Sequence, residues 1–243
     1  MNLTKIKYLI SKNLTFSQLK NRKLLKKEAI KLRGKILDLG CGNGEYSFLM
    51  AKHKNNKIFA LESNERLCKE IVNKNIENIE VILADGHNLP FTDNTFDACF
   101  CNTVLEHVKD PEKVIREIKR VLKKEGTLVI SIPFLQEIHA DPHDFQRYTP
   151  YGLKHLMEEN NFIIKRIHCD FGSLNVLEYL TLGSIIWRFR IGFKRNFPFG
   201  YIYILFLTVL FFILKISHLV FFPLQKRDKH FLTLVALIGI KSE

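Results

Sequence analysis

A glycine-rich turn after a short apolar strand constrains this chain more than any other feature. The stretch Ile36-Leu-Asp-Leu-Gly-Cys-Gly-Asn-Gly44 places its glycines directly after apolar residues that predict a strand. Glycine adopts backbone conformations that other residues avoid and carries no Cβ, so such a turn lets the main chain approach a ligand closely. A helix is predicted to follow from about Glu45 to His53. The sequence therefore predicts a ligand site where a strand end meets a helix N-terminus.

Strands and helices alternate along most of the chain. Apolar runs predict strands at residues 35–39, 57–62, 80–84, 95–101, 127–132 and 162–169, with a last strand at 231–240. Periodicity and capping residues predict helices at 45–53, 64–74, 111–124 and 150–160. Apolar strands that alternate with helices form a parallel sheet covered on both faces. The predicted fold class is therefore α/β, with a seven-stranded, mostly parallel sheet and helices on both faces.

The net charge of +12 lies mainly at two places in the chain. Residues 1–35 hold eleven Lys and Arg residues against one acid, and residues 188–230 carry a net charge of +7, whereas the stretch between them carries −5. Such asymmetry points to an anionic partner for the basic parts, either lipid headgroups or nucleic acid. The predicted domains are a basic N-terminal helical region at 1–33, a main domain at 34–171 and 231–243, and an apolar, basic insertion at 172–230.

The insertion contains the most apolar stretch of the chain, residues 201–222. As a helix this stretch is about 33 Å long, enough to span a bilayer. Lys215 and His218 would be costly near the bilayer centre, and the strand at 231–240 has to return the chain to the main domain. We therefore expect this helical insertion to lie in a membrane interface. The alternatives are a transmembrane span, a core helix covered by protein and a dimer interface.

The glycine spacing and a distant carboxylate narrow the class of ligand. Glu62, at the end of the second strand, follows Gly42 by 20 residues, a spacing that suits a carboxylate accepting hydrogen bonds from ribose hydroxyls. Dinucleotide-binding turns favour G-x-G-x-x-G, because a pyrophosphate must sit on the helix N-terminus. Here Gly44 comes one residue early, and Glu45 at the next position would repel a pyrophosphate. These features favour a ligand with an amino-acid end over one with phosphates.

Four further segments complete a resemblance to a known family. Asp38-Leu-Gly-Cys-Gly-Asn-Gly44 resembles the first motif of class I S-adenosylmethionine-dependent methyltransferases, which have a Rossmann-like fold. Ala84-Asp85-Gly86, Leu89-Pro90-Phe91 and Phe96-Asp97 resemble the next motifs. Asn102-Thr-Val-Leu-Glu-His-Val108 resembles the segment after the fourth strand in the type 11 subgroup, which includes quinone-pathway methyltransferases. The resemblance covers about residues 34–170, with 231–240 as the last strand.

The resemblance implies S-adenosyl-L-methionine as the cofactor and assigns residues to its parts. Gly40, Gly42 and Gly44 would line the methionine part, with Asp38 nearby. Glu62 would hold the ribose hydroxyls. Asp85 would reach the adenine amino group with Gly86 beside it, and Asn102 and Thr103 would lie under the cofactor near the substrate. The full predicted set of cofactor-binding residues is Asp38, Gly40, Gly42, Gly44, Glu62, Asp85, Gly86 and Asn102.

Candidate catalytic residues lie after the fourth and fifth strands, where open α/β sheets bind ligands. His107 is a candidate base, with a core-edge or helix-capping histidine as the alternative. In the loop from His139 to Thr149, His143 or Asp144 could deprotonate a hydroxyl, and Arg147 could bind an anionic group. The loop could instead only brace the sheet. Its His and Asp spacing also allows a metal, but we predict no metal site, and the five cysteines match no zinc pattern.

These features together predict an S-adenosylmethionine-dependent methyltransferase that works at a membrane surface. Its expected partners are a small-molecule or lipid-linked acceptor and an anionic membrane surface. An RNA methyltransferase using the basic N-terminus is an alternative, but aromatic residues do not interleave that basic run. A non-catalytic scaffold that keeps the cofactor fold is another. The expected location is cytoplasmic, peripheral or monotopic on the inner face of the cell membrane, with a transmembrane span as the alternative.

Overall fold

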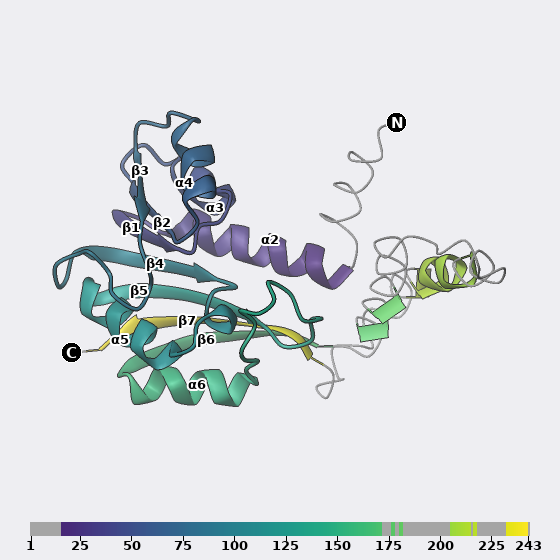
Figure 1. Cartoon of the computed structure of the whole chain (residues 1–243). Coiled ribbons are helices and arrows are strands. Elements are labelled where there is room, and N and C mark those ends of the chain that lie inside the picture. Colours follow the sequence, from purple (N-terminus) through teal and green to yellow (C-terminus); the bar gives the residue numbers. More distant parts are fainter. Residues whose placement is uncertain are drawn as a thin grey trace. The chain divides into compact units, whose positions relative to one another are not determined.

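The computed structural model describes residues 16–171, 176–177, 180–181, 205–214, 216–217 and 232–242 (Figure 1). The chain divides into two compact units. One unit comprises Leu24–Cys169 and Leu234–Glu243, and the other comprises Met1–Lys23 and Asp170–Thr233. The first half of the predicted N-terminal helical region and most of the predicted insertion lie outside the described residues.

The larger unit contains a sheet whose strands alternate with helices, as the sequence predicts (Figure 1). The strands are β1 (Lys35–Leu39), β2 (Lys57–Glu62), β3 (Ile79–Leu83), β4 (Phe96–Asn102), β5 (Leu122–Pro133), β6 (Phe162–Phe171) and β7 (Leu232–Lys241). The helices are α2 (Phe16–Lys31), α3 (Glu45–Met50), α4 (Glu65–Val72), α5 (Pro111–Val121) and α6 (Pro150–Glu159), with a short 3₁₀ helix η1 (Leu105–His107).

The sheet has seven strands in the order β3-β2-β1-β4-β5-β7-β6. The pairs β1–β2, β2–β3, β1–β4 and β4–β5 are parallel, and β5–β7 is antiparallel. The predicted α/β class with a mostly parallel sheet is therefore confirmed. The chain leaves β1 toward β2 on one side and returns to pair β4 on the other, so the strand order reverses at β1. Sheets of this kind bind ligands at such a point, outside the carboxyl ends of the strands.

Helices cover both faces of the sheet because successive strand residues point to opposite sides. On one face, Ile36 and Phe100 belong to a buried cluster with Leu25 and Ala29 of α2. On the other, Leu39 and Val114 of α5 both lie near the backbone of Gly86. The second half of α2 thus packs against the sheet, so this part of the predicted basic region contributes to the hydrophobic core.

Several predicted boundaries are wrong by three or more residues, since α3 ends at Met50 rather than about His53 and β5 begins five residues before Thr127. The sequence predicts a helix to about Lys124, but α5 ends at Val121 and β5 begins at Leu122. Leu122 is fully buried and pairs with Phe96 of β4. Its backbone is already extended, so the ladder with β4 ends the helix earlier than periodicity alone indicates.

Residues 205–214 of the smaller unit form a helix. Leu207 and Phe211 are buried, while much of the rest of its apolar surface is exposed. Within the part of the chain that the structure describes, no helix combines the length and apolar content needed to cross a membrane. The exposed apolar residues near this helix are Leu205, Phe206, Val209, Phe212, Ile213 and Ile216.

We expect the substitution Phe100→Ala to destabilise the protein strongly. Phe100 is fully buried in the middle of β4, and its ring lies 4.7 Å from that of Tyr46, centroid to centroid. Removing the ring leaves a cavity, so the free energy of unfolding should fall by about 3–5 kcal/mol. Denaturant unfolding followed by circular dichroism measures this change. Tyr151→Ala, at a position 83% exposed, is the control and should cost less than about 0.5 kcal/mol. Equal midpoints for the two variants would contradict this packing.

Candidate active site

The three glycines of the turn after β1 have different surroundings. Gly40, Gly42 and Gly44 all have positive φ, at 66°, 56° and 77°. A Cβ on Gly40 would lie 2.4 Å from the side chain of Val104, and one on Gly44 would lie 2.9 Å from Phe48. A Cβ on Gly42 would meet nothing within 4 Å. Gly40 and Gly44 are therefore needed for packing as well as for conformation, whereas Gly42 faces open space that a ligand can enter.

The carboxylate of Glu62 joins the end of β2 to the glycine turn. Its Oε2 accepts a hydrogen bond from the Gly42 amide at 2.9 Å. Its Oε1 accepts hydrogen bonds from the amides of Ser63 at 2.9 Å and Asn64 at 3.0 Å. The Ser63 hydroxyl also donates to Oε1, at 3.4 Å, whereas among the described residues Oε2 accepts only the Gly42 bond and so retains a lone pair for a ligand hydroxyl. Glu62 therefore lies where the sequence places it, beside Gly42, and also holds the turn in shape.

Asp38 lies beneath the turn, in the core. Its Oδ2 accepts a hydrogen bond from Ser47 Oγ of α3 at 2.5 Å. Burial raises the pKa of Asp38 to about 7, although the hydrogen bonds from Ser47 act in the opposite direction. The residue links β1 to the helix that follows the turn. In the structure Asp38 therefore contacts α3, the helix that follows the glycine turn. The sequence alone does not distinguish this supporting position from direct contact with the cofactor.

Asp85 and Gly86 follow β3 beside the end of β2, because the Ala84 amide donates to the Glu62 carbonyl at 3.1 Å. Asp85 Oδ1 accepts from the His87 amide at 2.7 Å and lies 2.6 Å from His87 Nδ1. The backbone hydrogen bond from His87 lowers the pKa of Asp85 below its usual range. Asp85 is thus an ionised, exposed acceptor on the same edge of the sheet as Glu62.

The end of β4 is fixed by a neighbouring strand. Asn102 Oδ1 accepts a hydrogen bond from Ser131 Oγ of β5 at 2.5 Å, and the Thr103 amide donates to the Ser131 carbonyl at 2.9 Å. Thr103 has a φ of 53°, which is unfavourable for a β-branched residue. Strained backbone of this kind costs about 1–3 kcal/mol and is concentrated at functional sites. The strand end is therefore held in a fixed, strained conformation next to the turn.

The structure brings together the two predicted groups of catalytic candidates. The Phe145 amide donates to the Glu106 carbonyl at 2.7 Å, and His107 Nδ1 lies 2.6 Å from the His143 carbonyl oxygen. Gln146 Nε2 donates to the carbonyls of Leu105 at 3.3 Å and Val108 at 2.9 Å. These bonds attach the loop after β5 along the whole length of η1. The two segments therefore form one surface at the carboxyl edge of the sheet.

Asp144 is poorly suited to the role of base that the sequence suggests. Both its oxygens bind the Arg147 guanidinium, at 2.5 and 2.8 Å, and Oδ2 also accepts from the His139 amide at 3.0 Å. The Arg147 ion pair holds the pKa of Asp144 well below its usual range. A carboxyl with so low a pKa is a weak proton acceptor. Both terminal nitrogens of Arg147 bind Asp144, which disfavours the predicted role of Arg147 in binding an anionic group. His143 has an exposed side chain, and the structure leaves its predicted role untested.

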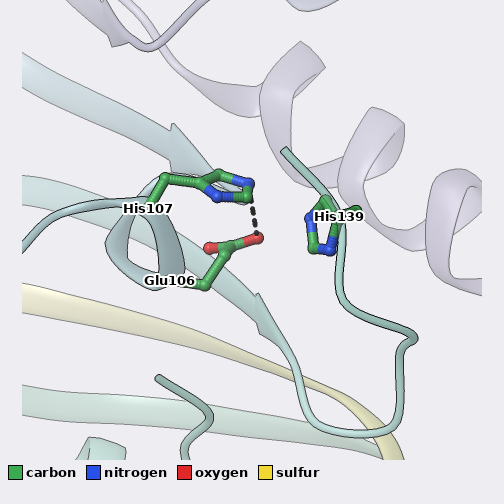
Figure 2. Close-up of side chains that lie close together, drawn as sticks. All are labelled: Glu106, His107 and His139. Carbon is green, nitrogen blue, oxygen red and sulfur yellow. Dashed lines mark ion pairs between the residues drawn. The ribbon is translucent and has the colours of Figure 1, made fainter. Parts of the chain in front are cut away.

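Glu106 is a residue to which the sequence analysis gave no role. Its side chain is fully buried, and burial raises its pKa to about 7. Figure 2 shows its carboxylate beside the rings of His107 and His139, with Oε1 3.8 Å from His107 Nε2. The signal that could have found it is a carboxylate next to His107 directly after a buried strand. Its burial and its approach to His139 depend on tertiary structure.

The fold and the site together define a class. A switch-point glycine turn, a carboxylate at the end of β2 that binds that turn, and an exposed acid after β3 are the features of a class I S-adenosylmethionine-dependent methyltransferase domain. Residues 37–130 match a family model described as a methyltransferase domain. Over this stretch the chain is therefore similar to the type 11 methyltransferase domain, a domain whose cofactor is S-adenosylmethionine.

Individual relatives support the same family. A demethylmenaquinone methyltransferase from Thermotoga maritima is 39% identical over 97 residues, which are 40% of this chain and 42% of the relative. The ubiquinone/menaquinone biosynthesis C-methyltransferase of Francisella tularensis subsp. novicida is 25% identical over 71% of this chain and 79% of its own. The structure of a SAM-dependent methyltransferase from Aquifex aeolicus has a TM-score of 0.52 at 24% identity, and the match covers 69% of this chain and 92% of the Aquifex chain. The chain thus spans less than half the length of the Thermotoga relative.

The raised pKa of Asp38 predicts a pH-dependent contribution to stability. In the folded, ligand-free protein the pKa is about 7, above an unfolded value of about 3.9, so the native state holds an extra proton between these values. This contribution is complete below about pH 4 and is lost as the pH rises through 7. Asp38→Asn should therefore lose less stability than the wild type between pH 5 and pH 8, by about 2 kcal/mol. Urea unfolding at both pH values measures the difference.

Comparing the variant with the wild type cancels the contributions of other groups. Asp97→Asn is a suitable control, because the Lys123 side chain and the Lys35 amide lower the pKa of Asp97 overall, despite its partial desolvation. It should not reduce the loss of stability between pH 5 and pH 8. Parallel pH profiles for the wild type and Asp38→Asn would show that Asp38 is ionised throughout this range.

Proposed function

We propose that this chain transfers the methyl group of S-adenosylmethionine to a small hydrophobic acceptor at a membrane surface. The observation that carries the proposal is the open space at Gly42, with the Glu62 carboxylate bound directly to that residue's amide. This arrangement gives a ligand access to the backbone and an anionic acceptor for ribose hydroxyls at one place. The match of residues 37–130 to a methyltransferase domain supports the choice of ligand.

The cofactor would follow the carboxyl edge of the sheet. Its ribose hydroxyls would bind Glu62, and its adenine amino group would bind Asp85. The positively charged methionine end would lie on the turn at Gly42, above Asp38. Asn102 and Thr103 would then lie near the methyl group, at the strained end of β4. Each assignment matches the role that family resemblance gives the same residue.

Methyl transfer is an in-line displacement at the sulfonium carbon, which the cofactor activates by itself. The protein's main task is therefore to align the acceptor with the methyl group and to exclude water. A base is needed only if the acceptor carries a proton at neutral pH. His107 and His143 are the candidates. We assign Asp144 to positioning instead, because it fixes Arg147 and the backbone of His139 in the loop.

Two observations support a hydrophobic acceptor and a membrane surface. The relatives from Thermotoga maritima and Francisella tularensis subsp. novicida are named for quinone methylation, which suggests an acceptor of comparable chemistry. The helix at 205–214 exposes several large apolar residues, and the sequence around it is basic. Apolar side chains with neighbouring cations are the features of an interfacial segment.

Glu62→Gln tests the cofactor site. The substitution removes the negative charge that accepts hydrogen bonds from the turn and, in the proposal, from the ribose. Charge-assisted hydrogen bonds contribute about 1.5–3 kcal/mol, so S-adenosylmethionine should bind roughly 10- to 100-fold more weakly. Isothermal titration calorimetry measures the affinity. Glu70→Gln, on the exposed side of α4, is the matched control and should bind like the wild type.

The acceptor is tested with methyl-labelled S-adenosylmethionine and a total membrane extract from the source cell. Label transferred into material that partitions into organic solvent, by the wild type and not by Glu62→Gln, is the expected result. Label found only in water-soluble products would overturn the hydrophobic acceptor while leaving the methyltransferase activity in place. No transfer and no cofactor binding would refute the proposal as a whole.

The double substitution Phe206→Ser and Phe212→Ser tests the membrane surface. Both side chains are exposed on the 205–214 helix. Burying one such side chain contributes about 1.5–3 kcal/mol, so the double variant should bind anionic vesicles at least about 100-fold more weakly than the wild type. Co-sedimentation with vesicles containing phosphatidylglycerol measures the partition. Tyr151→Ser, on the exposed surface of α6, should bind like the wild type, and equal binding by all three proteins would contradict membrane docking through this helix.

A further inference from the structure

We propose that Glu106, His107 and His139 bind one divalent transition-metal cation such as Zn²⁺. One ligand atom from each side chain lies within 4.8 Å of the other two. The residues come from two segments, η1 and the loop after β5, which the hydrogen bonds along η1 hold together. Figure 2 shows the three side chains converging.

The state of Glu106 is the strongest sign of a missing partner. Its side chain is fully buried, and neither carboxylate oxygen has a hydrogen-bond partner within the described structure. Buried polar groups are almost always hydrogen-bonded, because leaving one without a partner costs free energy. The guanidinium of Arg147 is bound at both ends by Asp144 and makes no hydrogen bond to Glu106. A cation between Glu106 and the histidines supplies the partner that the carboxylate lacks.

Both histidines have one ring nitrogen already occupied. His107 Nδ1 lies 2.6 Å from the His143 carbonyl oxygen, and His139 Nδ1 lies 3.1 Å from the Glu137 carbonyl oxygen. A carbonyl only accepts hydrogen bonds, so Nδ1 carries the proton in each ring. Nε2 of each ring is then left with a lone pair. Histidine ligands of metals are typically oriented by an outer hydrogen bond of this kind.

The donor set indicates the class of metal. Two imidazoles and one carboxylate suit zinc and other first-row transition ions, whereas calcium and magnesium prefer oxygen ligands. In a tetrahedral zinc site the ligand atoms lie about 3.3 Å apart, so binding requires the side chains to close by up to about 1.5 Å. His139 is partly exposed on a loop, so its ring can make this adjustment. Three protein ligands leave a fourth position open.

The open position gives the metal a role that rests on the proposed function. Val104 directly precedes η1, and its side chain packs against Gly40. The 3₁₀ helix η1 therefore begins beside the glycine turn. An acceptor hydroxyl bound at the fourth position would lose its proton more readily, because a bound cation lowers the pKa of its oxygen ligands. Metal binding itself does not depend on this role. No spacing motif in the sequence indicates this site, because 32 positions separate His107 from His139.

The test uses the full-length protein, freed of metal with a chelator and titrated with Zn²⁺ by calorimetry and with Co²⁺ by visible absorption. We expect one ion per chain and absorption bands typical of tetrahedral Co²⁺. Glu106→Gln and His139→Ala should each weaken binding by at least about 10- to 100-fold. His155→Ala, an exposed histidine on α6, is the matched control and should bind like the wild type.

Folding and cofactor binding are measured on the same samples. Zn²⁺ should raise the thermal unfolding temperature of the wild type and of His155→Ala, because a ligand that binds only the native state stabilises it, and should not raise that of His139→Ala. His139 is partly exposed, so this variant remains informative if Glu106→Gln fails to fold. No stoichiometric binding, or binding that survives both substitutions, would overturn the metal site. S-adenosylmethionine titrations report separately whether the proposed function holds.

Discussion

The hydrogen bond from the Gly42 amide to Glu62 is the interaction on which the site depends. It connects the glycine turn, which has no regular secondary structure, to the end of the buried strand β2. The turn can adopt this conformation because its three residues with positive φ are glycines. Without the carboxylate the turn would have an unpaired amide beside the ligand space. The same carboxylate also accepts from two amides that begin the segment leading into α4. One side chain therefore sets the positions of two adjacent loops, beside the open space at Gly42.

A second set of bonds builds the other half of the site from parts that are distant in sequence. Ser131 of β5 binds both Asn102 and the backbone of Thr103, so the end of β4 cannot relax from its strained conformation. The loop after β5 is in turn bound along η1 by main-chain and Gln146 contacts. The energy that holds Thr103 at positive φ thus comes from the neighbouring strand. Strain supported in this way fixes where η1 starts, and so where Glu106 and His107 point.

Local signals determined how much could be predicted from the sequence. The bounds of β1 and β2 are as predicted, because both strands are buried on both faces and end at a glycine or a carboxylate that the pattern makes visible. The end of α5 was misplaced, since the pairing of Leu122 with Phe96 is a tertiary constraint that periodicity does not contain. Arg147 lies three residues after Asp144, yet only the folded loop shows that the two neutralise each other. Glu106 went unassigned for the same reason, as its burial arises from segments that meet only in the folded protein.

The two proposed tasks, methyl transfer and membrane docking, fall on parts of the chain with opposite net charge. Several acids of the main domain lie near the edge where a cationic sulfonium would bind, and two of them, Asp38 and Glu106, are buried with pKa values raised to about 7. A nearby cation favours ionisation of such a buried carboxyl, because the attraction between opposite charges offsets the desolvation that raised the pKa. Binding of a cationic cofactor beside Asp38 would therefore lower the pKa of that carboxyl and release protons. The basic flanks carry the opposite charge, and an anionic surface is the partner that their charge favours. The sign of the charge thus changes along the chain where the proposed function changes from catalysis to docking.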